Sequence, residues 1–181
     1  MMNRILIFFF ISLFFSCGNS VPRKPILRKS STEMKESVSF NKALNETEEN
    51  AFKIYMKADS IHNYIASPKG FWYFYNNKSD RMDVPKFGDE VIYTYEVYDL
   101  NNHIIYSEEE VGQQVYVIDK QEIVEGLRNG LKLMKEGENI TFLFPSHKMF
   151  GFSGDENKIG INQQLIYKVQ LNKLNKKNEN N

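Results

Sequence analysis

The sequence predicts an α+β fold in which one short helix covers a β-sheet. The helical signal is in residues 120–134, where apolar residues recur at the spacing of three and four that places them on one helix face: Ile123, Val124, Leu127, Leu131 and Met134. On both sides of it, segments rich in β-branched and aromatic residues predict strands at 70–75, 91–97, 104–106, 115–118, 140–144 and 165–171. A lone short helix needs an apolar partner, so we expect these strands to form one antiparallel sheet against it.

Gly126 and Gly130 lie inside the predicted helix, where each glycine costs about 1 kcal/mol relative to alanine. Two interpretations are open. Either another backbone approaches the helix closely at these positions, or both are tolerated on the surface.

The composition excludes several classes of protein. The chain has 181 residues, a formal net charge of zero, 41% hydrophobic and 25% charged residues, which is typical of one globular domain with appendages. Neutrality argues against a nucleic-acid partner. A single cysteine excludes an intrachain disulfide and a cysteine-rich zinc site, and His62, His103 and His147 lack the spacing of metal ligands. We therefore expect no metal and no cofactor.

The N-terminus predicts export. Arg4 precedes an apolar run at 5–15 that is shorter than the roughly 20 residues needed to span a bilayer but suits the apolar core of a secretory signal. The run ends at Ser16-Cys17, which resembles a bacterial lipoprotein signal. We predict a signal peptide at 1–16, acylation of Cys17, and anchoring in the cell envelope facing the periplasm. The alternative is a cleaved signal that happens to include a cysteine.

A linker and a helix follow. Residues 17–45 are mostly polar without a sustained period, which predicts a flexible, lipid-anchored tether. Residues 46–69 are predicted as a helical segment. Its helix spans 48–65, with Asn45 or Thr47 as its cap, and Pro68 and Gly70 end it. An apolar stripe lies along it, formed by Phe52, Tyr55, Ala58, Ile61 and Ile65. The stripe either packs on its own domain or joins two copies of the chain. No residue favours the homodimer.

The main domain is predicted at 70–174 and a polar tail at 175–181. Residues 85–89 predict a turn before the long strand, and Asn101-Asn102 a tight hairpin, because asparagine tolerates the left-handed conformation. Residues 108–110 are three glutamates, for which we expect a solvated loop.

Short motifs then follow in an order that resembles the FKBP family of peptidyl-prolyl isomerases. They are Pro-Lys-Phe-Gly-Asp-Glu-Val at 85–91, Tyr95, Ile-Tyr-Ser at 105–107, Gln-Glu-Ile-Val-Glu-Gly-Leu at 121–127, Lys-Glu-Gly-Glu at 135–138, 145–151, and Leu-Ile-Tyr-Lys-Val-Gln-Leu at 165–171. With the lipoprotein signal and helical segment ahead of it, the chain is similar to lipid-anchored FKBP-type proteins of gliding bacteria. The resemblance implies a twisted antiparallel sheet wrapped around the short helix, with an apolar pocket between them.

The resemblance also implies site residues. Tyr95 and Tyr167 would form aromatic walls, Ile123 and Val124 the pocket edge, and the backbone N–H of Ile159 would receive a ligand carbonyl.

Other positions depart from the family pattern. Leu127 replaces the floor tryptophan, Phe150 replaces a tyrosine that offers a hydroxyl, and Ile105-Tyr106 replaces a Phe-Asp pair. Two polar anchors are thereby lost, each worth about 1 kcal/mol. Two functions stay open: an isomerase acting on proline-containing polypeptide clients, and a weakly catalytic binding or chaperone module in a secretion or motility assembly.

Overall fold

The computed structural model describes residues 31–177, and of residues 31–33 only the backbone. The predicted signal peptide, Cys17 and the first part of the predicted tether lie outside the described residues. Of the described residues, 38–177 belong to one compact unit and 31–37 to another. Within 31–177, no helix has the length and apolar character needed to cross a membrane.

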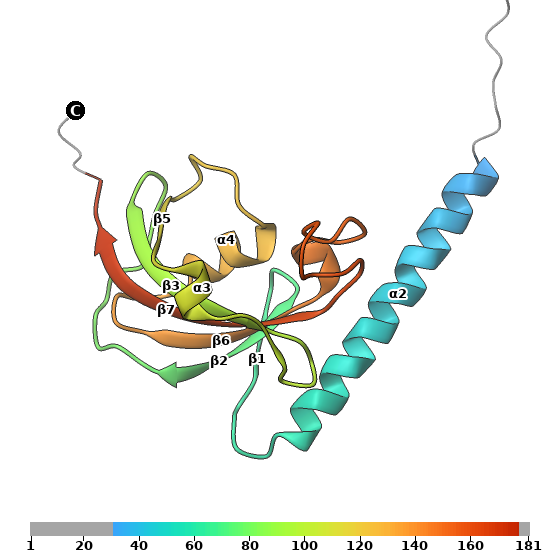
Figure 1. The fold of residues 1–181 in the computed structure, drawn as a ribbon, viewed down its shortest axis with the longest axis horizontal. Coiled ribbons are helices and arrows are strands. Elements are labelled where there is room, and N and C mark those ends of the chain that lie inside the picture. The colour runs from blue at the N-terminus through green and yellow to red at the C-terminus, as the bar shows by residue number, and fades with distance from the viewer. Residues whose placement is uncertain (1–30, 178–181) are drawn as a thin grey trace, which may run out of the picture. The chain divides into compact units, whose positions relative to one another are not determined.

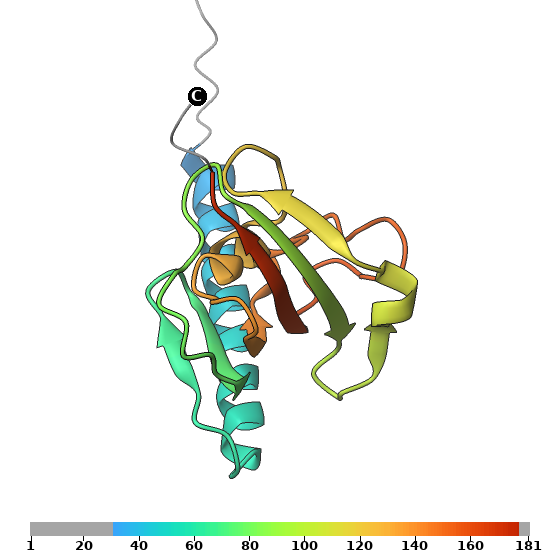
Figure 2. The same cartoon turned by 90° about the vertical axis from the view of Figure 1, so that its left-hand side faces the viewer.

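One seven-stranded antiparallel sheet organises the compact unit (Figure 1). Its strands are β1 (Ile65–Ser67), β2 (Phe71–Asn77), β3 (Glu90–Tyr98), β4 (Ile104–Tyr106), β5 (Gln114–Val117), β6 (Asn139–Phe144) and β7 (Leu165–Asn175). They follow the order β1-β2-β6-β7-β3-β4, and β5 also pairs with β3. The outer edge of β3 is thus shared by β4 at one end and β5 at the other (Figure 2). The predicted antiparallel sheet is confirmed, and β1, which lies before the predicted domain start at residue 70, extends it.

The segments between the strands agree only in part with those predicted from the sequence. Asn102 has φ 60°, so the left-handed residue predicted for the hairpin is confirmed. The glutamates at 108–110 were expected in a loop, but they form one helical turn, α3 (Glu108–Val111), because the Ser107 side chain caps it by accepting from the Glu110 N–H. The tail expected from residue 175 begins later, since β7 includes Asn175 and the Lys177 N–H donates to Asp89.

The short helix α4 (Glu125–Leu131) covers one face of the sheet but is shorter than predicted. Asp119 has φ 57°, which turns the chain, and Val124 is extended, so the helix starts only at Glu125. Ile123 and Val124 nevertheless pack against the same core as Leu127 and Leu131. The apolar pattern identified the buried face correctly but overestimated the length.

Gly126 and Gly130 are the contact points of α4 with the sheet. A Cβ at Gly126 would lie 2.7 Å from Met149 Sδ and 2.8 Å from the Phe144 ring, and one at Gly130 would lie 3.1 Å from the Phe142 ring. Both glycines are buried. Neither interpretation of them was right, because the groups that approach closely are side chains rather than backbone.

The long helix α2 (Ser31–Ala58) differs in extent from both predictions for this region. It begins inside the predicted tether, in a sequence that contains no Gly or Pro. Asn45 and Thr47 are therefore interior residues, not caps. The helix ends before Ile61 because the Asp59 carboxylate accepts the Ile61 and His62 N–H groups and forms a turn.

The part of α2 within the compact unit packs on its own domain. Phe52 is fully buried with Leu143 and Ile166, and its ring lies 5.4 Å from that of Trp72. Neighbouring residues of β6 and β7 point the other way, toward α4. The two helices thus cover opposite faces of the sheet, as the intramolecular interpretation of the Phe52 stripe requires.

Candidate functional site

The predicted site residues lie in one apolar cluster between α4 and the sheet. Leu127, Ile159 and Tyr167 are buried there, and six partly buried residues pack against the same cluster: Tyr95, Ile105, Tyr106, Ile123, Val124 and Phe150. They come from β3, β4, β7, the start of α4 and the loop after β6. The structure therefore brings together residues that are far apart in the sequence.

The centre of this cluster is an aromatic wall on the sheet. Tyr95 stacks on Tyr167 with ring centroids 5.2 Å apart, and the Phe144 ring meets Tyr167 edge-on at 5.7 Å. Burial raises the pKa of the Tyr95 and Tyr167 hydroxyls. Both hydroxyls therefore stay protonated at neutral pH and cannot act as bases.

The loop of residues 146–162 carries Phe150 to the cluster. It opens with a 3₁₀ turn, η2 (Ser146–Lys148), whose Ser146 carbonyl accepts both the Met149 and the Gly151 N–H at 2.9 Å. Asn162 N–H closes the other end by donating to the Gly151 carbonyl at 2.7 Å. Phe150 is thus fixed by hydrogen bonds on both of its neighbours.

Ile159 does not present a free N–H as the resemblance implied. Its N–H donates to Asp155 Oδ1 at 2.8 Å, and the residue is 4% exposed. A ligand carbonyl would have to displace this bond. The expected donor role therefore finds no support in the geometry, and Ile159 contributes its apolar side chain instead.

Asp155 is the residue that sequence reasoning missed. Its Oδ2 accepts from the Tyr106 hydroxyl at 2.5 Å, and its Oδ1 also accepts from the Asn157 N–H at 2.9 Å. Burial alone would raise the pKa of Asp155, but the bonds from Tyr106, Ile159 and Asn157 outweigh it and lower that pKa. The one available signal was the short Gly-Asp-Glu-Asn run at 154–157, which is typical of a turn built by an aspartate side chain.

A second pair of charges reinforces this connection. Lys158 Nζ lies 2.5 Å from Glu110 Oε1, on α3, and 4.9 Å from the centroid of the Tyr106 ring. The loop is thereby joined to β4 and α3. The resemblance implied a hydroxyl at position 150 and a carboxylate at position 106, which Phe150 and Tyr106 do not supply. Both kinds of group nevertheless lie beside the cluster, as the hydroxyl of Tyr106 and the carboxylate of Asp155.

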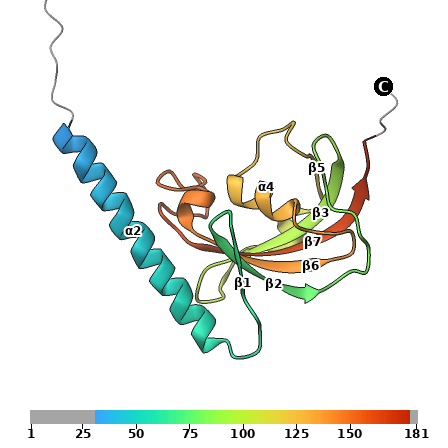
Figure 3. The same ribbon diagram turned by 180° about the vertical axis from the view of Figure 1, so that it is seen from behind.

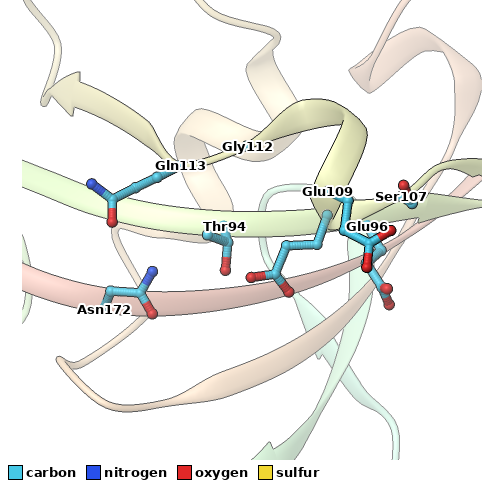
Figure 4. A pocket seen from close by; sticks show the side chains of 8 residues that line it. Thr94, Glu96, Ser107, Glu109, Gly112, Gln113 and Asn172 are labelled. Carbon is cyan, nitrogen blue, oxygen red and sulfur yellow. The ribbon is translucent and has the colours of Figure 1, made fainter.

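Two hollows lie next to this cluster or on the other face of the sheet. A polar hollow of about 700 Å³ is lined by Thr94, Glu96, Ser107, Glu109 and Asn172 (Figure 4). Thr94 and Glu96 alternate along β3 with Tyr93 and Tyr95, so this hollow lies on the opposite face from the aromatic wall. Another, of about 480 Å³, lies between α2 and the 146–162 loop, and Phe150 also lines it. Among residues 31–177 no cluster of side chains could hold a metal ion.

Removing the Tyr106 hydroxyl tests the Asp155 connection. In Tyr106→Phe we expect the pKa of Asp155 to rise, because a donor to its charged form is lost, and the free energy of unfolding to fall by about 1–2 kcal/mol. Carboxyl-carbon NMR titration and urea denaturation measure the two effects. The pKa of Asp155 is depressed in the folded protein. The stabilisation from its hydrogen bonds is therefore present above the pKa of an unfolded aspartate, about 3.9, and is lost as the pH falls through the folded-state pKa. The difference from wild type should then shrink below about pH 4.

Tyr98→Phe is the matched control, since the Tyr98 hydroxyl donates to Glu96 at 2.7 Å, in a pair that does not include Asp155. The control should leave the Asp155 titration unchanged. An unchanged Asp155 midpoint in Tyr106→Phe would contradict the connection.

Comparison with known proteins agrees with this geometry. Residues 82–172 match the family described as FKBP-type peptidyl-prolyl cis-trans isomerase, which is half of the chain. No curated protein matches the chain. Among solved structures it is similar to FkpA from Escherichia coli, with a TM-score of 0.59 and 18% identity over 96% of this chain and 82% of that one. The chain therefore belongs to the FKBP-type peptidyl-prolyl cis-trans isomerases.

Proposed function

We propose that this protein is a lipid-anchored prolyl isomerase of the bacterial cell envelope that assists the folding of envelope or secreted proteins, gliding-motility proteins among them. The observation that carries the isomerase site is the cluster in which Tyr95, Tyr167 and Phe150 meet the start of α4. Its aromatic and aliphatic side chains suit a proline ring. The client is a polypeptide, with no nucleic acid and no cofactor involved.

The reaction suits such a site because it needs no proton transfer. Rotation about a peptide bond costs about 18–20 kcal/mol because resonance is lost. The planar amide is more polar than the twisted one, so apolar surroundings that replace water favour the twisted form. Protonated Tyr95 and Tyr167 provide such surroundings without adding charge.

The second candidate, a weakly catalytic binding module, is favoured by a specific observation. Phe150 has no hydroxyl to hold a client carbonyl, and the Ile159 N–H is already bonded to Asp155. Fewer free polar groups would hold the client backbone during rotation. We therefore propose that isomerisation is slow but measurable.

An NMR exchange assay on short X-Pro peptides, which needs no coupled protease, tests the isomerase. Wild-type protein should accelerate cis–trans exchange. Phe150→Ala should lower the rate about tenfold, because a pocket wall is removed, and Phe150→Tyr should raise it about fivefold by restoring a hydroxyl, worth about 1 kcal/mol.

Phe152→Ala is the control from the same loop, since this side chain is 85% exposed and should not affect the rate. Peptide binding without acceleration, unaltered by Phe150→Tyr, would favour the binding module. No binding and no acceleration would refute both candidates.

Membrane attachment is proposed on the sequence alone, from the apolar run that ends at Ser16-Cys17. Several acyl chains on one cysteine anchor a protein durably, at about 0.8 kcal/mol for each buried methylene. Expressed with its native signal, Cys17→Ser should move from the membrane fraction to the soluble envelope fraction, and its mass should lack acyl chains. A Cys17→Ser protein that stays in the membrane fraction with the same mass shift as wild type would contradict acylation at this residue.

A further inference from the structure

We infer that Glu48, on α2, is a positioning residue for the isomerase site, and that it holds the Phe150 loop from the face of the sheet opposite α4. The inference rests on the proposed function, because it concerns the same site. It assigns the helix that precedes the family domain a role in catalysis as well as in packing. The matching family region begins only at residue 82.

The contact that carries the inference is a buried carboxyl group. Glu48 is 3% exposed, and both of its side-chain oxygens accept hydrogen bonds from one residue, Ser146. The Ser146 N–H donates to Oε2 at 2.9 Å, and its hydroxyl donates to Oε1. Ser146 is itself 1% exposed. Leaving such buried groups without partners is unfavourable, so this bond pair fixes where the loop leaves β6.

The chain of contacts continues from Ser146 to Phe150. The Ser146 carbonyl accepts the N–H groups of Met149 and Gly151, the two neighbours of Phe150. A shift of Ser146 would therefore move both flanks of Phe150 together. The Glu48 carbonyl also accepts from Gln164 Nε2 at 2.8 Å, beyond the far end of the loop. One residue of α2 thus contacts the chain on both sides of the loop.

The site side of the loop has a separate attachment. Lys148 Nζ lies 2.8 Å from Glu125 Oε1, at the start of α4. Figures 1 and 3 show the loop between α4 and α2. The loop is consequently held from both sides, by an ion pair toward α4 and by buried hydrogen bonds toward α2. Beside the hydrogen bonds to α2, a hollow lined by Asn41, Leu44 and Phe152 separates part of the loop from this helix.

Two variants with a matched control test the inference. Glu48→Ala should accelerate hydrogen exchange at the Met149 and Gly151 amides about tenfold or more, and should lower kcat/KM for X-Pro peptides about tenfold. Glu48→Gln should recover both to within about threefold of wild type, because its amide oxygen can still accept the Ser146 N–H and its amide nitrogen can donate to the Ser146 hydroxyl. Glu49→Ala changes the neighbouring glutamate, whose side chain is 49% exposed, and should match wild type.

Two internal references distinguish a local effect on the loop from unfolding of the whole domain. The single tryptophan, Trp72, packs on Phe52, so its fluorescence reports whether α2 remains docked. The Val169 amide in the centre of β7 should keep its slow exchange in every variant. If Glu48→Ala unfolds the protein, Ser146→Ala, which removes the hydroxyl but keeps the N–H, decides the question by the same exchange measurement.

Unchanged exchange at Met149 and Gly151 in a folded variant would overturn the inference, as would a kcat/KM equal to that of Glu49→Ala. The proposed function fails differently, by absence of isomerase activity in wild type. In that case kcat/KM gives no comparison, and the exchange data alone decide whether Glu48 holds the loop.

Discussion

The contact between α4 and the aromatic face of the sheet is the constraint on which the rest of the structure depends. At Gly126 and Gly130 the helix has no side chains, so the Phe144 and Phe142 rings reach its surface. Those two rings stack on each other at 5.3 Å with an interplanar angle of 9°. A Cβ at Gly126 would displace both Phe144 and Met149, the residue before Phe150. The close packing of α4 on the sheet therefore also determines the position of the 146–162 loop.

Successive residues of β6 face opposite sides of the sheet, so the same strand contacts α4 on one face and α2 on the other. Phe142 and Phe144 face α4, whereas Leu143 between them packs on Phe52 of α2. Both helices thus depend on the same strand, and the loop that follows it is attached to both. A site built this way is fixed by packing on two faces of one sheet, which suits a reaction that depends on shape and exclusion of water more than on charged groups.

Much of the domain could be predicted from the sequence because its signals are local. Segments such as 91–97 and 165–171 carry β-branched and aromatic residues, and the Asn101-Asn102 turn carries its own conformational preference. The helix extents could not be predicted as well. Residues 31–45 lack an obvious apolar stripe, and at 120–124 apolar spacing continues although these residues form a turn and irregular backbone ahead of the helix.

The polar contacts that hold the site loop could not be predicted from the sequence, for a different reason. Glu48 and Ser146 are 98 residues apart in the sequence, and Tyr106 and Asp155 are 49 apart, so neither pair has a local pattern. The residues that the family resemblance implied as apolar site residues lie in one cluster. The resemblance also implied a free N–H at Ile159, which Asp155 occupies because it stands four residues earlier in the same turn.

The most direct measurement of the central claim is the location of a bound proline. Amide NMR spectra of the folded protein, titrated with an Ala-Pro-containing peptide, should show the largest shifts at Tyr95, Val124 and Tyr167, with intermolecular contacts from the proline ring to the Tyr95 and Tyr167 rings. Shifts concentrated instead at Asn41, Leu44 and Phe152, around the hollow beside α2, would contradict it, because the client would then bind behind the loop and away from the aromatic wall.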